Sequence, residues 1–288
     1  MTKIRQSRRF RWLAYLIQQS SIRGHLNIDK DRLEEARLAN RAFLRTVDCW
    51  IREPDYQGSI FQYGLPPRMR HLIDAPMTDE VTYSDVISYL ARAMGPDLRY
   101  LELGVSVGKN FSQVLNHVNG AELTCFDIED INPVLEEMLV REDQVEWPTA
   151  HASMRKKPSR LTEYNFARNG NKVHYLAGDI FDEQSWERLR GQSYNLVFSD
   201  AFHSASALLK EWEMIKACNI LAPDGFIMMW DDLGDREMRG AFYQIVKEMS
   251  VGHGLDKANA GIMFYRGWLG EHAPYHPIGF MRMTRRWR

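Results

Sequence analysis

Short apolar runs alternate with helix-forming stretches from Leu98 onward, and this alternation constrains the fold more than any other feature. The first five runs each end at or near an acidic residue or a glycine: 99–103, 123–127, 173–177, 195–199 and 226–230. Such alternation is typical of βα units, which build a parallel sheet. Two later runs, 261–265 and 278–283, are expected to close the sheet, and an antiparallel pair is one way to do so. We predict an α/β fold with a Rossmann-like, seven-stranded, mostly parallel sheet sandwiched by helices.

The first 80 residues follow a different pattern and predict an N-terminal helical cap. Apolar residues recur near the helical period there: Leu33, Ala36, Phe43, Val47 and Trp50. Glycines and prolines between positions 56 and 76 indicate a connecting segment. We therefore expect a cap and linker over 1–80 and the main domain over 81–288. The long stretch between the second and third strands predicts an insertion near 129–172.

Composition serves mainly to exclude classes of protein. The formal net charge is −1, so the total charge gives no reason to expect a nucleic-acid partner. The apolar stretch 12–17 is too short for a signal-peptide core or a membrane span, so no membrane partner is expected. The three cysteines, Cys49, Cys125 and Cys218, form no CxxC pair, which argues against a zinc site and favours a reducing cytoplasm.

The segment 100–111 has the pattern of a cofactor-binding turn between a strand and a helix. Gly104 lets the backbone turn without a Cβ clash, and Gly108 lets the amides of the helix start approach a ligand. Glu102 suits a cationic ammonium group and would repel a pyrophosphate. Ser106 stands where a dinucleotide motif needs its second glycine, and the spacing of the two glycines is one residue short of a P-loop. S-adenosylmethionine (SAM) is therefore favoured over NAD.

Acidic residues also follow the next two strands. Asp127 is placed to accept the ribose hydroxyls of an adenosine group, with a plain surface acid as the alternative. Asp179 could meet the adenine amino group while Ile180 packs on the ring. Ligands of open α/β sheets bind outside the carboxyl ends of the strands. The predicted cofactor-binding residues are Glu102, Gly104, Ser106, Gly108, Asp127, Asp179 and Ile180.

The chain resembles the class I SAM-dependent methyltransferases over about residues 80–288. The resemblance rests on the sequence ELGVSVG at 102–108, on Asp127, on the Gly-Asp pair at 178–179 and on LAPDG at 221–225. The sequences DAFH at 200–203 and WDDL at 230–233 resemble the metal-dependent O-methyltransferases of the macrocin and catechol type. This second resemblance implies that Asp200, Asp231 and Asp232 bind a divalent cation together with the substrate oxygens.

Physical reasoning supports a cation at the same three residues. Carboxylates about 4 Å apart at an effective dielectric near 20 repel by roughly 4 kcal/mol per pair. Protonation or a cation must relieve this repulsion, and hard oxygen ligands favour Mg²⁺. The alternative is that Asp231 and Asp232 only bond the following turn, with Asp235 as the cap of the next helix.

His203 and Asp200 are the predicted catalytic residues. An imidazole titrates in the useful range, and His203 follows Asp200 by three residues at the catalytic rim. His253 is the alternative base. Sugar-modifying relatives tend to place a histidine soon after the acidic pair, whereas Leu233 and Gly234 follow it here. This departure leaves the acceptor and the base open.

These features favour a cytoplasmic SAM-dependent methyltransferase that uses Mg²⁺ to methylate an oxygen of a small hydroxylated metabolite. A metal-independent methyltransferase acting on nitrogen, carbon or a macromolecule is the main alternative. An NAD-type oxidoreductase and a noncatalytic SAM-binding protein are the others. The expected partner is a small-molecule acceptor, and the N-terminal helical segment is a candidate for homo-oligomer formation.

Overall fold

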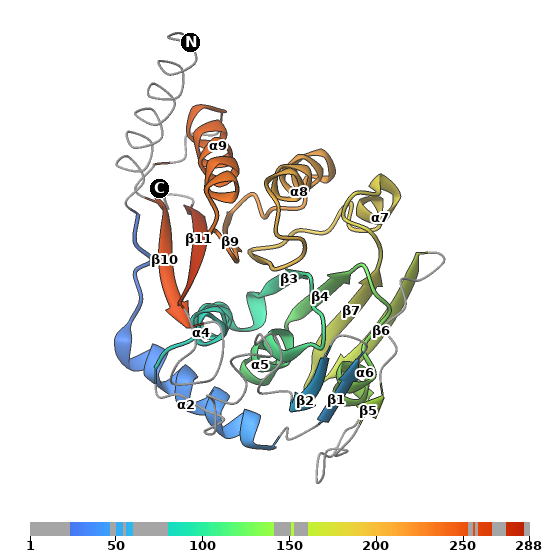
Figure 1. The fold of residues 1–288 in the computed structure, drawn as a ribbon. Helices are drawn as coiled ribbons and strands as arrows, with labels where there is room; N and C mark the ends of the chain where they lie inside the picture. Colours follow the sequence, from blue (N-terminus) through green and yellow to red (C-terminus); the bar gives the residue numbers. More distant parts are fainter. Residues whose placement is uncertain are drawn as a thin grey trace, which may run out of the picture.

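One twisted eight-stranded sheet runs through the molecule (Figure 1). The computed structural model describes residues 24–46, 50–53, 56–59, 80–140, 151–152, 161–252, 256, 259–266 and 275–284. The strand order is β10-β11-β9-β8-β3-β4-β7-β6. In chain order these strands are β3 (Arg99–Leu103), β4 (Glu122–Asp127), β6 (Thr162–Arg168), β7 (Asn171–Ala177), β8 (Leu196–Ser199), β9 (Gly225–Trp230), β10 (Ala260–Arg266) and β11 (Tyr275–Thr284).

The central strands β7, β4, β3, β8 and β9 are parallel, as the alternation of runs predicts. Their order corresponds to 3-2-1-4-5 of a doubly wound sheet, so the order reverses between β3 and β8. Ligands of such sheets bind outside the carboxyl ends of the strands at this switch point. At the far side, β11 inserts antiparallel between β9 and β10, one of the arrangements expected for the last two strands.

The α/β class is confirmed, but the predicted count of seven strands is one too low. The additional strand, β6, lies within the expected insertion at 129–172 and pairs antiparallel with β7. Asn169 and Gly170 join the two strands with φ of 51° and 69°. Positive φ at both residues is the requirement of a tight hairpin turn that Asn-Gly sequences satisfy. The same region also contains the helix α6 (Pro133–Val140) and the short strand β5 (His151–Ala152).

The N-terminal region is helical only in part. The helix α2 (Lys30–Thr46) agrees with the predicted cap. The next described elements are the antiparallel strands β1 (Trp50–Glu53) and β2 (Tyr56–Ser59), and β1 also pairs with β5. The assignment of Trp50 to the helical pattern is therefore wrong.

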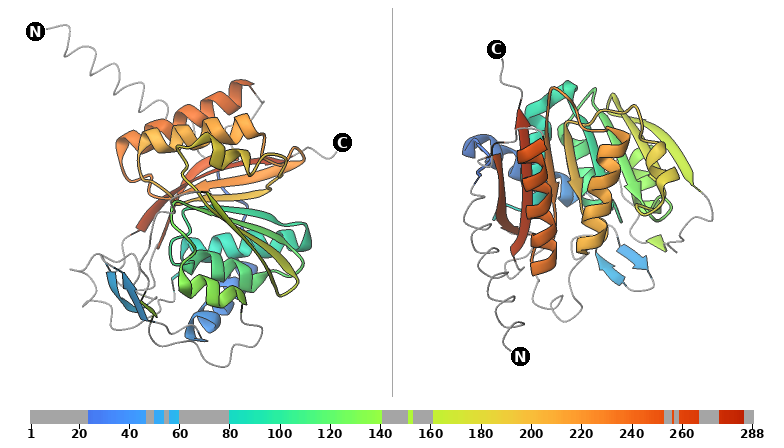
Figure 2. Two further views of the ribbon diagram at one scale, coloured as in Figure 1. Left: turned by 90° about the vertical axis from the view of Figure 1, so that its right-hand side faces the viewer. Right: turned by 90° about the horizontal axis from the view of Figure 1, so that it is seen from above.

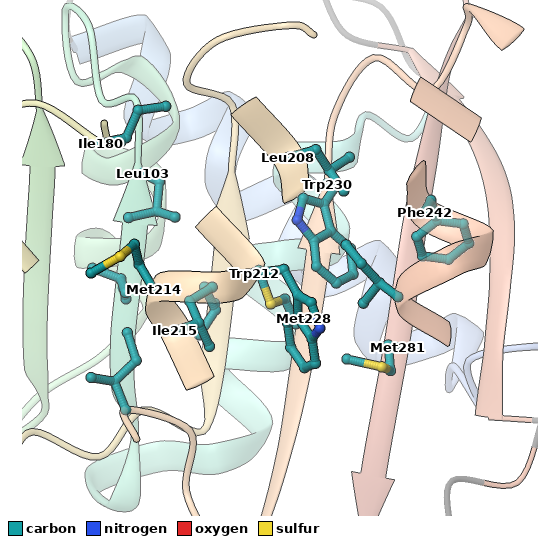
Figure 3. Close-up of a cluster of buried hydrophobic side chains, with 14 of the residues drawn as sticks. Leu103, Ile180, Leu208, Trp212, Met214, Ile215, Met228, Trp230, Phe242 and Met281 are labelled. Carbon is teal, nitrogen blue, oxygen red and sulfur yellow. The ribbon is translucent and has the colours of Figure 1, made fainter. Parts of the chain in front are cut away.

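Helices cover both faces of the sheet (Figure 2). The helices α2, α4 (Tyr83–Met94), α5 (Lys109–His117) and α6 lie on one face, with the one-turn η2 (Gly95–Asp97) after α4. The helices α7 (Glu183–Glu187), α8 (Ala205–Cys218) and α9 (Arg236–Gly252) lie on the other. In the core between the sheet and the helices α8 and α9, Trp212 and Trp230 are 2% and 1% exposed and pack with Met228 and Phe242 (Figure 3). Trp212 therefore belongs to the core. No helix in the described part of the chain has the length and apolarity to span a membrane.

A buried polar network fixes the start of α4 against α2. The Asp85 carboxylate is fully buried and accepts from the Arg41 guanidinium at 2.8 and 3.0 Å and from the Asn40 amide at 2.8 Å. Asp85 also accepts from the backbone N–H of Thr82, whose hydroxyl in turn caps Asp85. The Asp85 of this reciprocal capping box also pairs with the buried Arg41 guanidinium, so the first turn of α4 has a defined position. The first residue of that turn, Tyr83, borders the candidate site.

Candidate active site

A cavity of about 310 Å³ lies outside the carboxyl ends of β3, β4, β7 and β8. This is where an open α/β sheet binds its ligand. The cavity is lined by Gly104, Ser106, Phe126, Asp127, Ile128, Glu129, Asp179, Ile180, Phe181, Asp200, Ala201 and Phe202. Five of the seven predicted cofactor-binding residues therefore line one cavity, and Glu102 and Gly108 lie outside that lining.

Asp127 organises the turn between β3 and α5. One carboxylate oxygen accepts from the backbone N–H groups of Val105 and Ser106, both at 2.7 Å, and the other accepts from the N–H of Glu129 at 2.9 Å. A carboxylate has about four acceptor positions, so the turn leaves room for a further donor. Asp127 thus has a structural role in addition to its place in the cavity lining. Because it is buried and bonded to three backbone N–H groups, it is not a plain surface acid.

The two glycines of the turn are required by close packing rather than by ligand contact alone. Both have φ of 78°. A Cβ on Gly104 would lie 2.3 Å from the carbonyl oxygen of Asp200, so the glycine allows the β8–α8 loop to approach. A Cβ on Gly108 would lie 2.8 Å from the Leu135 side chain of α6. The predicted ligand contact of Gly108 stays a prediction, because its position is explained by backbone conformation and packing.

Two residues of the site hold a backbone conformation that L-amino acids rarely adopt. Of the four described non-glycine residues with positive φ, two are asparagines in turns, and the others are Ser106 at 57° and Asp232 at 56°. Positive φ costs on the order of 1 kcal/mol or more and tends to occur at functional sites. Both residues follow strand ends at the candidate site, which supports a functional reason for the strain.

Glu102 lies beneath the turn and is 2% exposed. One of its carboxyl oxygens accepts from the Tyr100 hydroxyl at 2.7 Å and from the Asn110 amide at 2.8 Å. Burial raises the pKa of Glu102 to about 8. Near neutral pH the carboxyl group is therefore mostly protonated in the ligand-free protein. The positive charge of an arriving ammonium group would have to lower the pKa of Glu102, so that its proton leaves to solvent, before Glu102 could act as the predicted counter-charge.

Part of the cavity lining is apolar. Ile180 is 6% exposed, and the Asp179 carboxylate accepts from the N–H of Phe181 at 2.9 Å. At the mouth of the cavity, Phe181 and Phe202 remain about half exposed, and their rings meet edge to face at 6.3 Å. Sequence reasoning did not select these two phenylalanines, although each stands within two residues of a predicted acid. Exposed aromatic rings beside a cavity can contact a planar ligand group.

Three acids converge where β8 and β9 end, and two histidines pair with them. His203 contacts an Asp200 oxygen at 2.8 Å with Nε2 and an Asp232 oxygen at 3.0 Å with Nδ1. His276 contacts both oxygens of Asp231 at 3.0 and 3.1 Å with Nδ1. The predicted acids Asp200, Asp231 and Asp232 thus form one acidic cluster, and Asp200 also lines the cavity.

His203 is not poised as a free base in this arrangement. Hydrogen bonds to Asp200 and Asp232 raise the pKa of His203 to about 10, so the imidazole carries its proton near neutral pH. Its side chain is 45% exposed, and solvent weakens the pairing. Burial and the charge of Asp231 raise the pKa of Asp200 to about 7. The predicted role of His203 therefore requires that it first lose a partner or share its proton with Asp200.

His276 is the residue that the sequence analysis missed. In the described part of the chain, the cluster of potential metal ligands consists of Asp231, Asp232 and His276, whose donor atoms lie within 4.8 Å of one another. Asp200, predicted as the third ligand, is outside this set and pairs with His203. In the antiparallel pairing of β11 with β9, Gly279 lies opposite Trp230, which places His276 beside the acidic pair. His276 stands two residues before the predicted last run, 278–283, and in the structure it belongs to β11 itself.

Other predictions for this region have mixed outcomes. Asp235 caps α9, since its carboxylate accepts from the N–H of Met238 at 2.8 Å. Asp231 does bond the following turn, accepting from the N–H of Asp232 at 2.7 Å, in addition to its contact with His276. His253, the alternative base, lies outside the described residues.

Comparison with known proteins gives a limited result. No protein-family model and no curated protein matches the chain. The O-methyltransferase TomG from Streptomyces achromogenes, solved with SAM, resembles it with a TM-score of 0.45 and 14% identity over 89% of this chain and 91% of that one. An O-methyltransferase from Bacillus cereus in complex with SAH has a TM-score of 0.42 and 10% identity over 90% and 93% of the two chains. Cofactor-bound Rv0187 from MTB has the same TM-score and 14% identity over 90% and 92%. These TM-scores decide nothing about activity, so the proposal below rests on the site itself.

Proposed function

We propose that this protein is a SAM-dependent methyltransferase that methylates an oxygen of a small hydroxylated acceptor with the help of a divalent cation. The observation that carries the proposal is the adjacency of a cavity and a cluster of metal-ligand residues at one sheet edge. Asp200 lines the cavity, and its partner His203 contacts Asp232, which is one of the potential metal ligands. A methyl donor and an oxygen nucleophile could therefore meet at the boundary between the two.

The cavity has the chemistry that the adenosine part of SAM requires. Carboxylates at two strand ends, Asp127 and Asp179, can accept from hydroxyl or amino groups, and Ile180 offers an apolar surface. The volume of about 310 Å³ is at the lower end of the range for ligand pockets. SAM supplies a methyl group on a sulfonium, which an aligned oxygen nucleophile takes as the carbon–sulfur bond breaks.

The residues at the end of β9 fit a divalent cation. Asp231 and Asp232 offer hard oxygen ligands, and His276 adds an imidazole. Carboxylates suit Mg²⁺ and Mn²⁺, while imidazole also suits later transition metals. A cation held by Asp231, Asp232 and His276 would lower the pKa of a coordinated hydroxyl and offset the clustered negative charge.

Asp200 and His203 are placed to handle the proton of the acceptor hydroxyl. This proton must leave as the oxygen becomes a nucleophile, and a group whose pKa lies near the working pH accepts it best. Without a cation, Asp200 at the cavity wall has a pKa of about 7, and a cation on Asp231 and Asp232 would offset the charge that helps to raise it. His203 bonds Asp200 on one side and Asp232 on the other, so it can hold or pass on the proton.

Transfer of a labelled methyl group from SAM to a panel of catechols and sugars tests the proposal. We expect labelled products with Mg²⁺ or Mn²⁺, and on the order of 100-fold less with a chelator or after Asp231→Ala with Asp232→Ala. Asp224→Ala is the matched control, because Asp224 is an exposed acid just before β9, at the opposite sheet edge. Products that resist the chelator would favour the metal-independent alternative. Absence of both product and SAM binding would overturn the proposal.

A further inference from the structure

Tyr83 borders the acidic cluster, yet the mechanism above leaves it unused. It is the first residue of α4 (Figure 1). The buried side chains of α4 pack with side chains of β3, β8 and β9 in one hydrophobic core. Its ring centroid lies 5.4 Å from that of Phe198 and 5.9 Å from that of His276. Tyr83 therefore sits between the core of β8 and a candidate cation ligand.

The Tyr83 ring lies near carboxyl groups that already have hydrogen-bond partners. Its centroid is 5.9 Å from the ring of His276, which pairs with Asp231, and the negative charges of Asp200, Asp231, Glu102 and Asp232 act on its hydroxyl. Asp200 and Asp232 are held by His203, Asp231 by His276, and Glu102 by Tyr100 and Asn110. With the residues that the structure describes, the Tyr83 hydroxyl forms no hydrogen bond. A donor in this position is ready for an oxygen that enters from outside the protein.

The position of Tyr83 is fixed from both sides. The capping box of Thr82 and Asp85, with the buried Arg41, holds the turn that carries it. On the other side, both oxygens of Glu80 accept from the Arg266 guanidinium at 2.8 Å, which ties the start of α4 to β10. A donor held in place before the ligand arrives loses little entropy on binding. This arrangement suits a side chain that orients a substrate.

Resting on the proposed function, we propose that Tyr83 donates a hydrogen bond to the non-reacting oxygen of an acceptor with two neighbouring oxygens. Donation to the reacting oxygen would withdraw electron density from the nucleophile, whereas Asp200 and His203 are placed to take a proton from it. A phenol, with an ordinary pKa of about 10, is a donor near neutral pH. Tyr83 is thus a specificity-determining residue that selects which oxygen is methylated.

The test uses 3,4-dihydroxybenzoate as the probe, with SAM and Mg²⁺ or Mn²⁺, and measures the ratio of its 3- and 4-methyl ethers. For Tyr83→Phe we expect the KM for the probe to rise about tenfold. The ether ratio should move at least about threefold toward equal amounts, while the KM for SAM stays within about twofold. Tyr194→Phe is the matched control, because it removes another tyrosine hydroxyl, bonded to Thr124 at 3.1 Å, before β8 at the opposite sheet edge.

The outcomes separate this inference from the function on which it rests. An unchanged ratio and an unchanged KM in Tyr83→Phe, with an active wild type, would overturn the role of Tyr83 alone. The same ratio change in Tyr194→Phe would also overturn it, because the effect would then be general destabilisation. A wild type that binds SAM but forms neither ether would overturn the proposed acceptor class and this inference with it.

Discussion

The two halves of the candidate site handle negative charge in different ways. Around the β3–α5 turn, neutral donors hold the carboxyl groups: backbone amides bond Asp127, and the Tyr100 hydroxyl and Asn110 amide bond Glu102. At the ends of β8 and β9, histidines hold them instead. Neutral donors stay in place at any ordinary pH, whereas a histidine can lose its proton or yield to a cation. The first half is therefore a fixed frame, and the second is the exchangeable part where acceptor chemistry would occur.

Substitution of Asp200 should give the largest effect, because it removes the proton acceptor from the exchangeable half. We expect Asp200→Asn to lower kcat by about 10²- to 10⁴-fold. Affinity for SAM should stay within a few-fold, since the cavity keeps its other walls. Steady-state kinetics with SAM calorimetry measure both effects, and Asp224→Asn is the control. A near-normal kcat in Asp200→Asn would remove Asp200 from the mechanism.

Substitution of the two histidines should separate cation binding from proton handling. His276→Ala should weaken Mn²⁺ binding by about 10- to 100-fold, an effect typical of altered metal sites. His203→Ala should leave Mn²⁺ affinity within a few-fold and lower kcat instead. Titration followed by electron paramagnetic resonance reports free and bound Mn²⁺ directly. His174→Ala is the control, because His174 pairs with Glu163 away from the site. Equal losses in His276→Ala and His203→Ala would contradict the division of roles.

Substitution of Asp127 should damage the fixed frame itself. Asp127→Ala leaves three backbone N–H groups without their acceptor, so the free energy of unfolding should fall by about 1–3 kcal/mol. The Kd for SAM should rise about tenfold because the turn no longer holds its shape. Asp29→Ala is a matched control, since Asp29 also accepts from backbone N–H groups, at the start of α2, and does not line the cavity. Chemical denaturation and calorimetry provide the two readouts, and normal SAM affinity in Asp127→Ala would count against the frame.

The smallest expected effect concerns His117, a histidine that burial keeps neutral, in contrast to the two in the site. Burial lowers the pKa of His117 to about 4, and its Nε2 lies 2.9 Å from the Asn40 oxygen. As the pH falls below about 6.5, His117 becomes protonated in the unfolded chain but stays neutral in the folded chain. The free energy of unfolding therefore decreases between about pH 6.5 and 4. From pH 7 to 5.5 the loss should be about 1 kcal/mol. The pH dependence of unfolding, compared with His117→Gln, isolates this contribution, and parallel curves would contradict it.

The fixed frame could be read from the sequence because its signals are local. The turn at 102–108 and the acids after β4 and β7 follow from runs and spacings within single βα units. His276 could not be found in this way, because only the antiparallel pairing of β11 with β9 brings it to the acidic pair. The same long-range pairing places His276 beside Asp231 and Asp232, whereas the contact of Asp200 with His203 is local, between residues three positions apart. The missed strand β6 is different, since the Asn-Gly turn at 169–170 was a local signal that went unused.

Calorimetric titration of SAM into the wild type, Asp127→Ala and Asp29→Ala proteins tests the proposed site most directly. We expect saturable binding to one site in the wild type, weakened about tenfold in Asp127→Ala and unchanged in Asp29→Ala. Absence of SAM binding in the folded wild type, or equal binding in all three proteins, would contradict the claim that the cavity at the carboxyl ends of the strands is a SAM site.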